Sequence, residues 1–197
     1  MRRGKGFWVS ISFMMLMCMN AFAGSDIKVD KNLEEVILKL DGTTNITFKT
    51  SDDKFEISDL TYDGVDKNPI VVKNNGKTII LEQRKSFGKE MTVNYTLTLP
   101  RNKNINISAG MANLKGELEA NNLRISSGLT MIDMKLSLAG KADISVGSGS
   151  LNLNFNKCDA VNVSAGSVTG NIWVPKGTPV TGLPKWNAVQ IHETAAH

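Results

Sequence analysis

The sequence predicts an all-β protein in which a β-solenoid, or β-helix, of stacked two-strand repeats follows a strand-rich N-terminal region. Two observations support this fold class. Apolar and polar residues alternate at a period of two in many short segments. A unit of about 19 residues also recurs through the second half of the chain. No segment after residue 23 has a sustained apolar pattern of helical period.

Residues 1–23 have the pattern of a secretory signal peptide. Basic residues come first, an apolar run over Phe7–Met19 follows, and Ala21-Phe22-Ala23 ends the segment. This order of charged, apolar and small residues is typical of a cleavable signal, and the apolar run is shorter than the ~20 residues that span a bilayer. We expect cleavage before Gly24, no transmembrane segment in the mature chain, and a periplasmic, cell-surface or secreted location.

Removal of the signal changes the charge of the protein. The mature chain keeps 20 basic and 19 acidic residues, a net charge of +1. A nucleic-acid-binding protein usually carries a clustered basic face, so this balance argues against a nucleic-acid partner. Cys158 is then the one remaining cysteine, and we expect a monomeric, at least partly buried thiol.

Residues 24–100 form the predicted N-terminal strand region. Alternation is clear in Val36-Leu38-Leu40 and in Val93-Tyr95-Leu97-Leu99. Stretches such as Asp41-Gly42 and Asn74-Asn75-Gly76 supply turn residues between the strands. We expect five to seven strands here.

Residues 101–174 contain four repeats. A serine recurs at intervals of 18, 19 and 19 residues, with a β-branched apolar residue before it and a glycine two positions after it. The serines are Ser108, Ser126, Ser145 and Ser164, and the glycines are Gly110, Gly128, Gly147 and Gly166. A two-strand unit cannot bury its own apolar face, so the units should stack in parallel with the serines in one column. An antiparallel sandwich is the alternative.

The four glycines are predicted structural turns, where the chain leaves one sheet with a positive φ. Residues 175–197 form a C-terminal tail that breaks the repeat, and Val189–Ile191 is a candidate for a final strand. A solenoid end needs a cover, so we expect this tail to act as a cap. The alternative is an incompletely covered end through which the molecules self-associate.

Several segments resemble a known family. They are Asp41–Asp53, Leu60-Thr61-Tyr62-Asp63-Gly64, Thr98-Leu99-Pro100 and the Ser-x-Gly repeats such as Ser145-Val146-Gly147-Ser148-Gly149. Together they are similar to the bacterial putative-adhesin domain family of unknown function. The resemblance implies a β-helical fold in exported or envelope-associated proteins, with no catalytic residues to assign.

The residues themselves also give no catalytic, cofactor-binding or metal-binding site. The glycine-rich segment Gly147–Ser150 lacks the lysine and the helix of a phosphate loop, and both histidines, His192 and His197, lie in the tail. The repeats do contain carboxylates, which are Glu117, Glu119, Asp133, Asp143 and Asp159. Aligning the repeats places basic residues beside three of them, in the pairs Arg124 with Asp143, Lys115 with Asp133, and Lys135 with Glu117.

Outward positions of the last two repeats carry amides and one aromatic ring. These residues are Asn152, Asn154, Asn156, Asn171 and Trp173. Amides beside a ring are suited to contacts with a sugar, whereas the alternative is an ordinary polar exterior.

Three functions remain. The first is an exported, non-enzymatic β-helical structural or adhesin-like protein of the cell envelope, with an envelope component or a glycan as partner. The second is a glycan-binding module. The third is a β-helical polysaccharide-degrading enzyme, which would need two suitably placed carboxylates.

Overall fold

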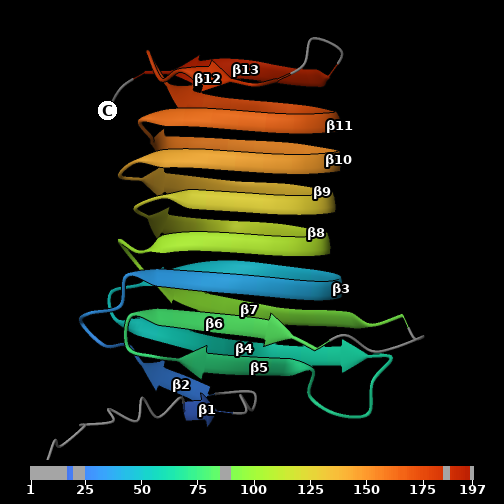
Figure 1. The fold of residues 1–197 in the computed structure, drawn as a ribbon. Helices are drawn as coiled ribbons and strands as arrows, with labels where there is room; N and C mark the ends of the chain where they lie inside the picture. The colour runs from blue at the N-terminus through green and yellow to red at the C-terminus, as the bar shows by residue number, and fades with distance from the viewer. Residues whose placement is uncertain (1–16, 20–24, 85–89, 184–186, 196–197) are drawn as a thin grey trace, which may run out of the picture.

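A computed structural model describes residues 17–19, 25–84, 90–183 and 187–195 (Figure 1). These residues form thirteen strands and no helix, which confirms the all-β prediction. In the same ranges no helix is long and apolar enough to cross a membrane. Most of the predicted signal peptide lies outside the described residues.

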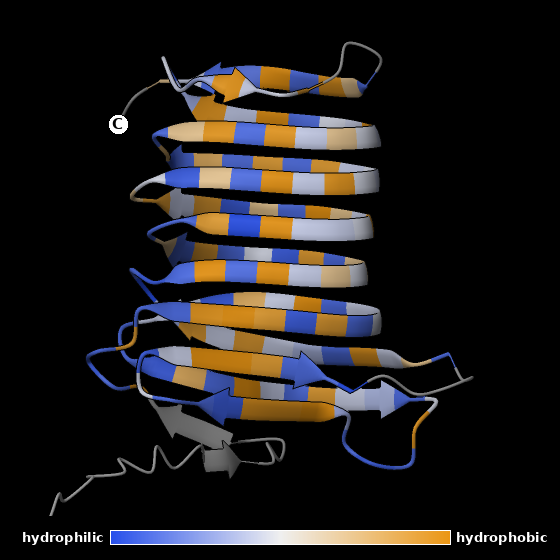
Figure 2. Ribbon diagram, viewed as in Figure 1, coloured by the Kyte–Doolittle hydropathy of each residue, from blue (hydrophilic) through white to orange (hydrophobic). Residues whose placement is uncertain are grey.

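Long bent strands stacked on one another form most of the molecule (Figure 1). They are β3 (Glu35–Ser51), β8 (Asn104–Ala120), β9 (Leu123–Leu138), β10 (Lys141–Lys157) and β11 (Ala160–Pro175). Each pairs in parallel with the next along the stack. Buried and exposed side chains alternate along them, and Figure 2 shows the same alternation in hydropathy. The apolar side chains form one core cluster that runs through all five strands.

The stacked strands keep one register. Ser108 pairs with Ser126, Ser126 with Ser145, and Ser145 with Ser164, so the four serines stand in one column as predicted. A slip of one residue would turn each apolar side chain outward, and the alternation of apolar residues therefore fixes this register.

Two sheets share the long strands. The first half of β3 pairs with β6 (Thr78–Gln83), whereas its second half pairs with β7 (Thr92–Pro100). At the other end, the first half of β11 pairs with β12 (Val180–Thr181) and its second half with β13 (Ala188–Thr194). The first halves thus belong to one sheet, called sheet I below, and the second halves to sheet II.

The predicted positive φ at the four corner glycines is wrong, because none of them has a positive φ. The pairing ladder is interrupted at each of them, and close approach explains why the residue is glycine. A Cβ on Gly128, Gly147 or Gly166 would lie 3.0, 2.5 or 2.4 Å from the carbonyl oxygen of the glycine one layer below. Gly110 begins the column, and its Cβ would meet nothing within 4 Å.

The N-terminal region adds antiparallel strands to both sheets. In sheet I, β5 (Ile70–Asn74) pairs with β6, and β1 (Met17–Met19) pairs with β5. In sheet II, β4 (Lys54–Asp63) pairs with β7, and β2 (Ser25–Lys28) pairs with β4. Six strands, β2 to β7, thus lie within residues 24–100, in agreement with the expected five to seven.

One layer of the stack lies outside the four predicted repeats. β3 pairs with β8 in the same register that joins the later layers, with Val36 opposite Ile105 and Ile46 opposite Leu114. Residues 52–103 separate β3 from β8 in the sequence and break the 19-residue interval. At the C-terminus, the predicted strand over Val189–Ile191 is confirmed as β13, which continues the stack by one parallel strand.

Tyr95 places a hydroxyl group in the apolar core. Its side chain on β7 is buried, and among the described residues its hydroxyl has no hydrogen-bond partner. Because a buried hydroxyl without a partner costs free energy, we expect Tyr95→Phe to leave the free energy of unfolding unchanged or to raise it by about 1 kcal/mol. Urea unfolding measures this change, and a loss of stability would mean that the hydroxyl is bonded.

Cys158 is buried between β10 and β11, as expected. Its Sγ donates to the carbonyl oxygens of Ala160 at 3.1 Å and Gly140 at 3.3 Å, and burial raises the pKa of the thiol. We expect maleimide labelling of the native protein at pH 8 to be at least about tenfold slower than labelling in urea, because the thiolate is the reactive form.

The same shift has a pH-dependent effect on stability. The pKa of the Cys158 thiol is higher in the folded state than in the unfolded state, where it is about 8.5. The contribution of Cys158 to stability is therefore present below about pH 8.5 and decreases as the pH rises above it. The Cys158→Ala variant should therefore lose less stability than the wild type between neutral and alkaline pH. Rapid native labelling, or a disulfide-linked dimer on a non-reducing gel, would contradict the buried thiol.

Candidate binding groove

Outward side chains on sheet II line two adjoining hollows, which we call the polar groove. The first hollow has a volume of about 440 Å³ and the second about 330 Å³. Gly116, Glu117 and Lys135 line both, so the hollows meet at β8 and β9. The groove therefore crosses successive layers of the stack instead of lying within one strand.

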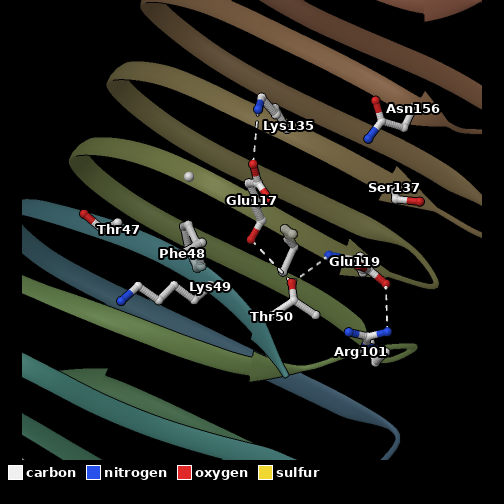
Figure 3. A pocket seen from close by; sticks show the side chains of 12 residues that line it. Thr47, Phe48, Lys49, Thr50, Arg101, Glu117, Glu119, Lys135, Ser137 and Asn156 are labelled. Atoms are coloured by element: carbon white, nitrogen blue, oxygen red, sulfur yellow. Dashed lines mark hydrogen bonds and ion pairs between the residues drawn. The ribbon is translucent and has the colours of Figure 1, made fainter. Parts of the chain in front are cut away.

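The first hollow forms where β3 and β8 separate (Figure 3). Their pairing ends at Phe48 and Gly116, and Gly116 has a φ of +109° with no room for a Cβ, which would lie 2.3 Å from the Phe48 carbonyl oxygen. Beyond this point the Thr50 hydroxyl joins the strands, because it accepts from the Glu119 N–H at 3.1 Å and donates to the Glu117 carbonyl oxygen at 3.4 Å. A side-chain bridge thus replaces the backbone ladder.

Most of the charged side chains in the first hollow form ion pairs. Lys135 Nζ lies 3.2 Å from Glu117 Oε1, and Arg101 lies 3.7 Å from Glu119; Figure 3 shows both pairs. Arg101 also lies 3.0 Å from Asp52. All of these side chains are substantially exposed, and such pairs contribute at most about 1 kcal/mol each. Lys49 also lines this hollow and takes part in none of these pairs. The hollow is therefore polar, with charges of both signs.

The three predicted cross-strand charge pairs all occur in register. Lys135 forms an ion pair with Glu117 at 3.2 Å, and Arg124 lies 4.0 Å from Asp143. Lys115 stands opposite Asp133, but these two form no ion pair in the part of the chain that the structure describes.

The second hollow contains the partly exposed ring of Trp173, whereas Phe48 beside the first hollow is buried. The Trp173 ring stacks on the His192 ring with 5.2 Å between centroids and 18° between planes. His192 is held in turn by Asn171, whose Oδ1 lies 3.1 Å from His192 Nε2. His192 belongs to β13, whereas the hollow lies toward Asn154 on β10. One face of the indole is therefore covered, and the hollow lies on its opposite side.

The structure brings the five predicted contact residues onto one sheet face. Asn152, Asn154 and Trp173 line the second hollow, and Asn156 lines the first. Asn171 pairs with Asn152 in the ladder and serves to hold His192.

The charged part of the groove was not predicted to be a binding surface. Those residues are Lys49, Arg101, Glu117, Glu119, Asp133 and Lys135. Lys135 on β9 and Trp173 on β11 both pair with Asn154 on β10. The repeat alignment therefore already placed Lys135 in the same outward column as Asn154 and Trp173.

The groove offers hydrogen-bonding groups and one partly exposed aromatic ring, that of Trp173. Within the described residues no group of three or more His, Cys, Asp or Glu side chains is placed to hold a metal ion. Its amide, hydroxyl and charged side chains can donate and accept hydrogen bonds with a polar ligand.

Comparisons with known proteins give little further information. No family model and no curated protein matches the chain. One similar solved structure is a putative adhesin from Bacteroides fragilis, with 18% identity, a TM-score of 0.32, and coverage of 87% of this chain and 94% of that one. Another is a putative cell adhesion protein from Clostridium sporogenes, with 14% identity, a TM-score of 0.33, and coverage of 87% and 99%. The resemblance to the adhesin-domain family stays a prediction.

Proposed function

We propose that this chain is an exported, non-enzymatic, adhesin-like β-solenoid protein of the cell envelope, which acts by presenting the polar groove to a partner. The observation that carries this proposal is the construction of the groove. Equivalent positions of successive layers supply its lining, from Glu117 and Lys135 to Asn154 and Trp173. Such a surface is long, rigid and repetitive, as adhesion requires.

The solenoid part of the proposal is supported by the parallel register. From β3 to β11, each long strand lies on the previous one with equivalent residues paired. Each layer contacts its neighbours and contributes to one shared core, which is the organisation of a solenoid. The antiparallel strands β4 and β5 then extend the two sheets at the N-terminal end.

A glycan is the second candidate for the partner, and Trp173 favours it. The ring is fixed by His192 on one side, while the hollow on its other side also contains Asn152 and Asn154. An aromatic ring supplies a large, rigid contact area, and amides both donate and accept hydrogen bonds, so together they match the apolar faces and hydroxyls of a sugar.

Binding of envelope polysaccharides to the purified mature chain tests the groove. We expect Trp173→Ala to weaken binding about thirtyfold, which corresponds to the ~2 kcal/mol typical of a central aromatic contact. Tyr62→Ala is the matched control, because Tyr62 is an exposed aromatic residue on β4 that does not line the groove. Equal effects of the two substitutions, measured by calorimetry, would reject the groove as the binding site.

Two further experiments test whether the protein is exported and whether it is an enzyme. Fractionation of cells, with mass measurement of the protein recovered, should place a chain that starts at Gly24 outside the cytoplasm. A cytoplasmic, uncleaved chain would overturn export. Turnover of a glycan that is lost in a folded Asp133→Asn or Asp143→Asn variant would overturn the non-enzymatic assignment.

A further inference from the structure

The stack ends in open strand edges at its C-terminus. β12 is the outer strand of sheet I and β13 the outer strand of sheet II, and among the described strands each pairs only with β11. An outer strand presents unpaired N–H and C=O groups that accept another strand. The C-terminal end therefore has two such edges side by side, one in each sheet.

The last layer also lacks the cover that every earlier layer has. Ile191 pairs with Ile172, which pairs with Leu153, which pairs with Met134, so the four side chains form one inward-facing column. Met134, Leu153 and Ile172 are 2%, 0% and 0% exposed, whereas Ile191 is 48% exposed. One more layer would bury Ile191 as completely as the residues below it.

The N-terminal end acquires a matching edge when the signal peptide is removed. The outer edge of β5 is paired with β1, and Met17–Met19 lie before the expected cleavage site after Ala23. Cleavage therefore removes the strand that covers β5, whose Ile70, Val71 and Val72 form a short apolar run. The partners of β1 are Val72, Lys73 and Asn74, so cleavage leaves the outer edge of these three residues unpaired. An unpaired strand edge accepts another strand. In sheet II the outer strand at this end is β2.

We infer that mature chains stack end to end, with the C-terminal layer of one copy on the N-terminal edge of the next. β12 and β5 are the outer strands of sheet I, and β13 and β2 are those of sheet II, so both sheets continue across the junction. The contact joins two different surfaces and leaves a free end on each side, so it generates an open linear filament. This inference rests on the proposed function, because it requires signal removal.

Sedimentation and electron microscopy of purified residues 24–197 test the inference. We expect concentration-dependent growth into filaments one molecule wide. Ile191→Lys should leave a monomer, because it places a charge in the junction at a residue that the isolated fold leaves exposed. Met131→Lys is the matched control, since Met131 is 57% exposed on the side of the stack, and it should assemble as the wild type does.

A chain that retains residues 17–23 provides a second arm. We expect it to assemble at least about tenfold more weakly, because β1 still covers β5. The inference is overturned if residues 24–197 stay monomeric, if Ile191→Lys assembles normally, or if Met131→Lys alone prevents assembly. These outcomes do not depend on where cells place the protein, so a failure of stacking is distinguished from a failure of export.

Discussion

Replacing Gly149 by alanine is expected to lower the free energy of unfolding by about 3 kcal/mol or more. Gly149 lies in β10 with a φ of +145°, a conformation that costs other residues about 1–3 kcal/mol. A Cβ there would also lie 1.7 Å from the Thr130 carbonyl oxygen on β9, and backbone cannot yield as a flexible side chain can. The two strands must therefore separate in the middle of the stack. Urea unfolding monitored by circular dichroism measures the loss.

Gly110→Ala is the control for this prediction. Gly110 lies at a corner of β8, and its Cβ would meet nothing within 4 Å. Its φ is not positive, so alanine should change the free energy of unfolding by less than about 0.5 kcal/mol. Similar losses for the two variants would show that glycine is required for some reason other than the close approach of layers.

The parallel stack was predictable because the apolar residues that it buries recur at a regular interval in the sequence. Inward positions must be apolar in every layer, so the column that contains Ile107, Ile125, Ile144 and Val163 repeats at the layer interval. The layer formed by β3 obeys the same rule. It was missed because residues 52–103, which contain four other strands, follow it, and a search for a constant interval cannot cross such an insertion.

The glycines show the limit of the same reasoning. A recurrent glycine in one column indicated a shared backbone requirement, but the sequence does not distinguish positive φ from lack of space. Within β8 to β11 the glycines with a positive φ are Gly116, Gly149 and Gly170, which occupy three different positions of the repeat. Glycine does not recur at any of these positions, so only the structure reveals that each lies against the backbone of the layer below.

Only the amide and indole part of the groove was predicted from the sequence. Amides and the indole were conspicuous because they share outward positions of two adjacent layers. Glu117 and Lys135 were interpreted only as partners of each other, and that interpretation is correct as far as the ion pair goes. The hollow beside them depends on the separation of β3 from β8 at Gly116, which is a property of the folded backbone and not of residue type.

Phe155→Ala is expected to remove about 3–5 kcal/mol from the free energy of unfolding. Phe155 is among the largest fully buried side chains and stands in the inward column above Leu118 and Leu136. Truncation loses the burial of the ring and leaves a cavity that the paired strands cannot close without losing their register. Phe155→Leu restores the residue of the two layers below and should cost less than about 1.5 kcal/mol. Urea midpoints at an unchanged m-value compare the variants. If alanine and leucine cost the same, the interior at this level adjusts to the loss of volume, and the stack is not a tightly packed column of equivalent residues.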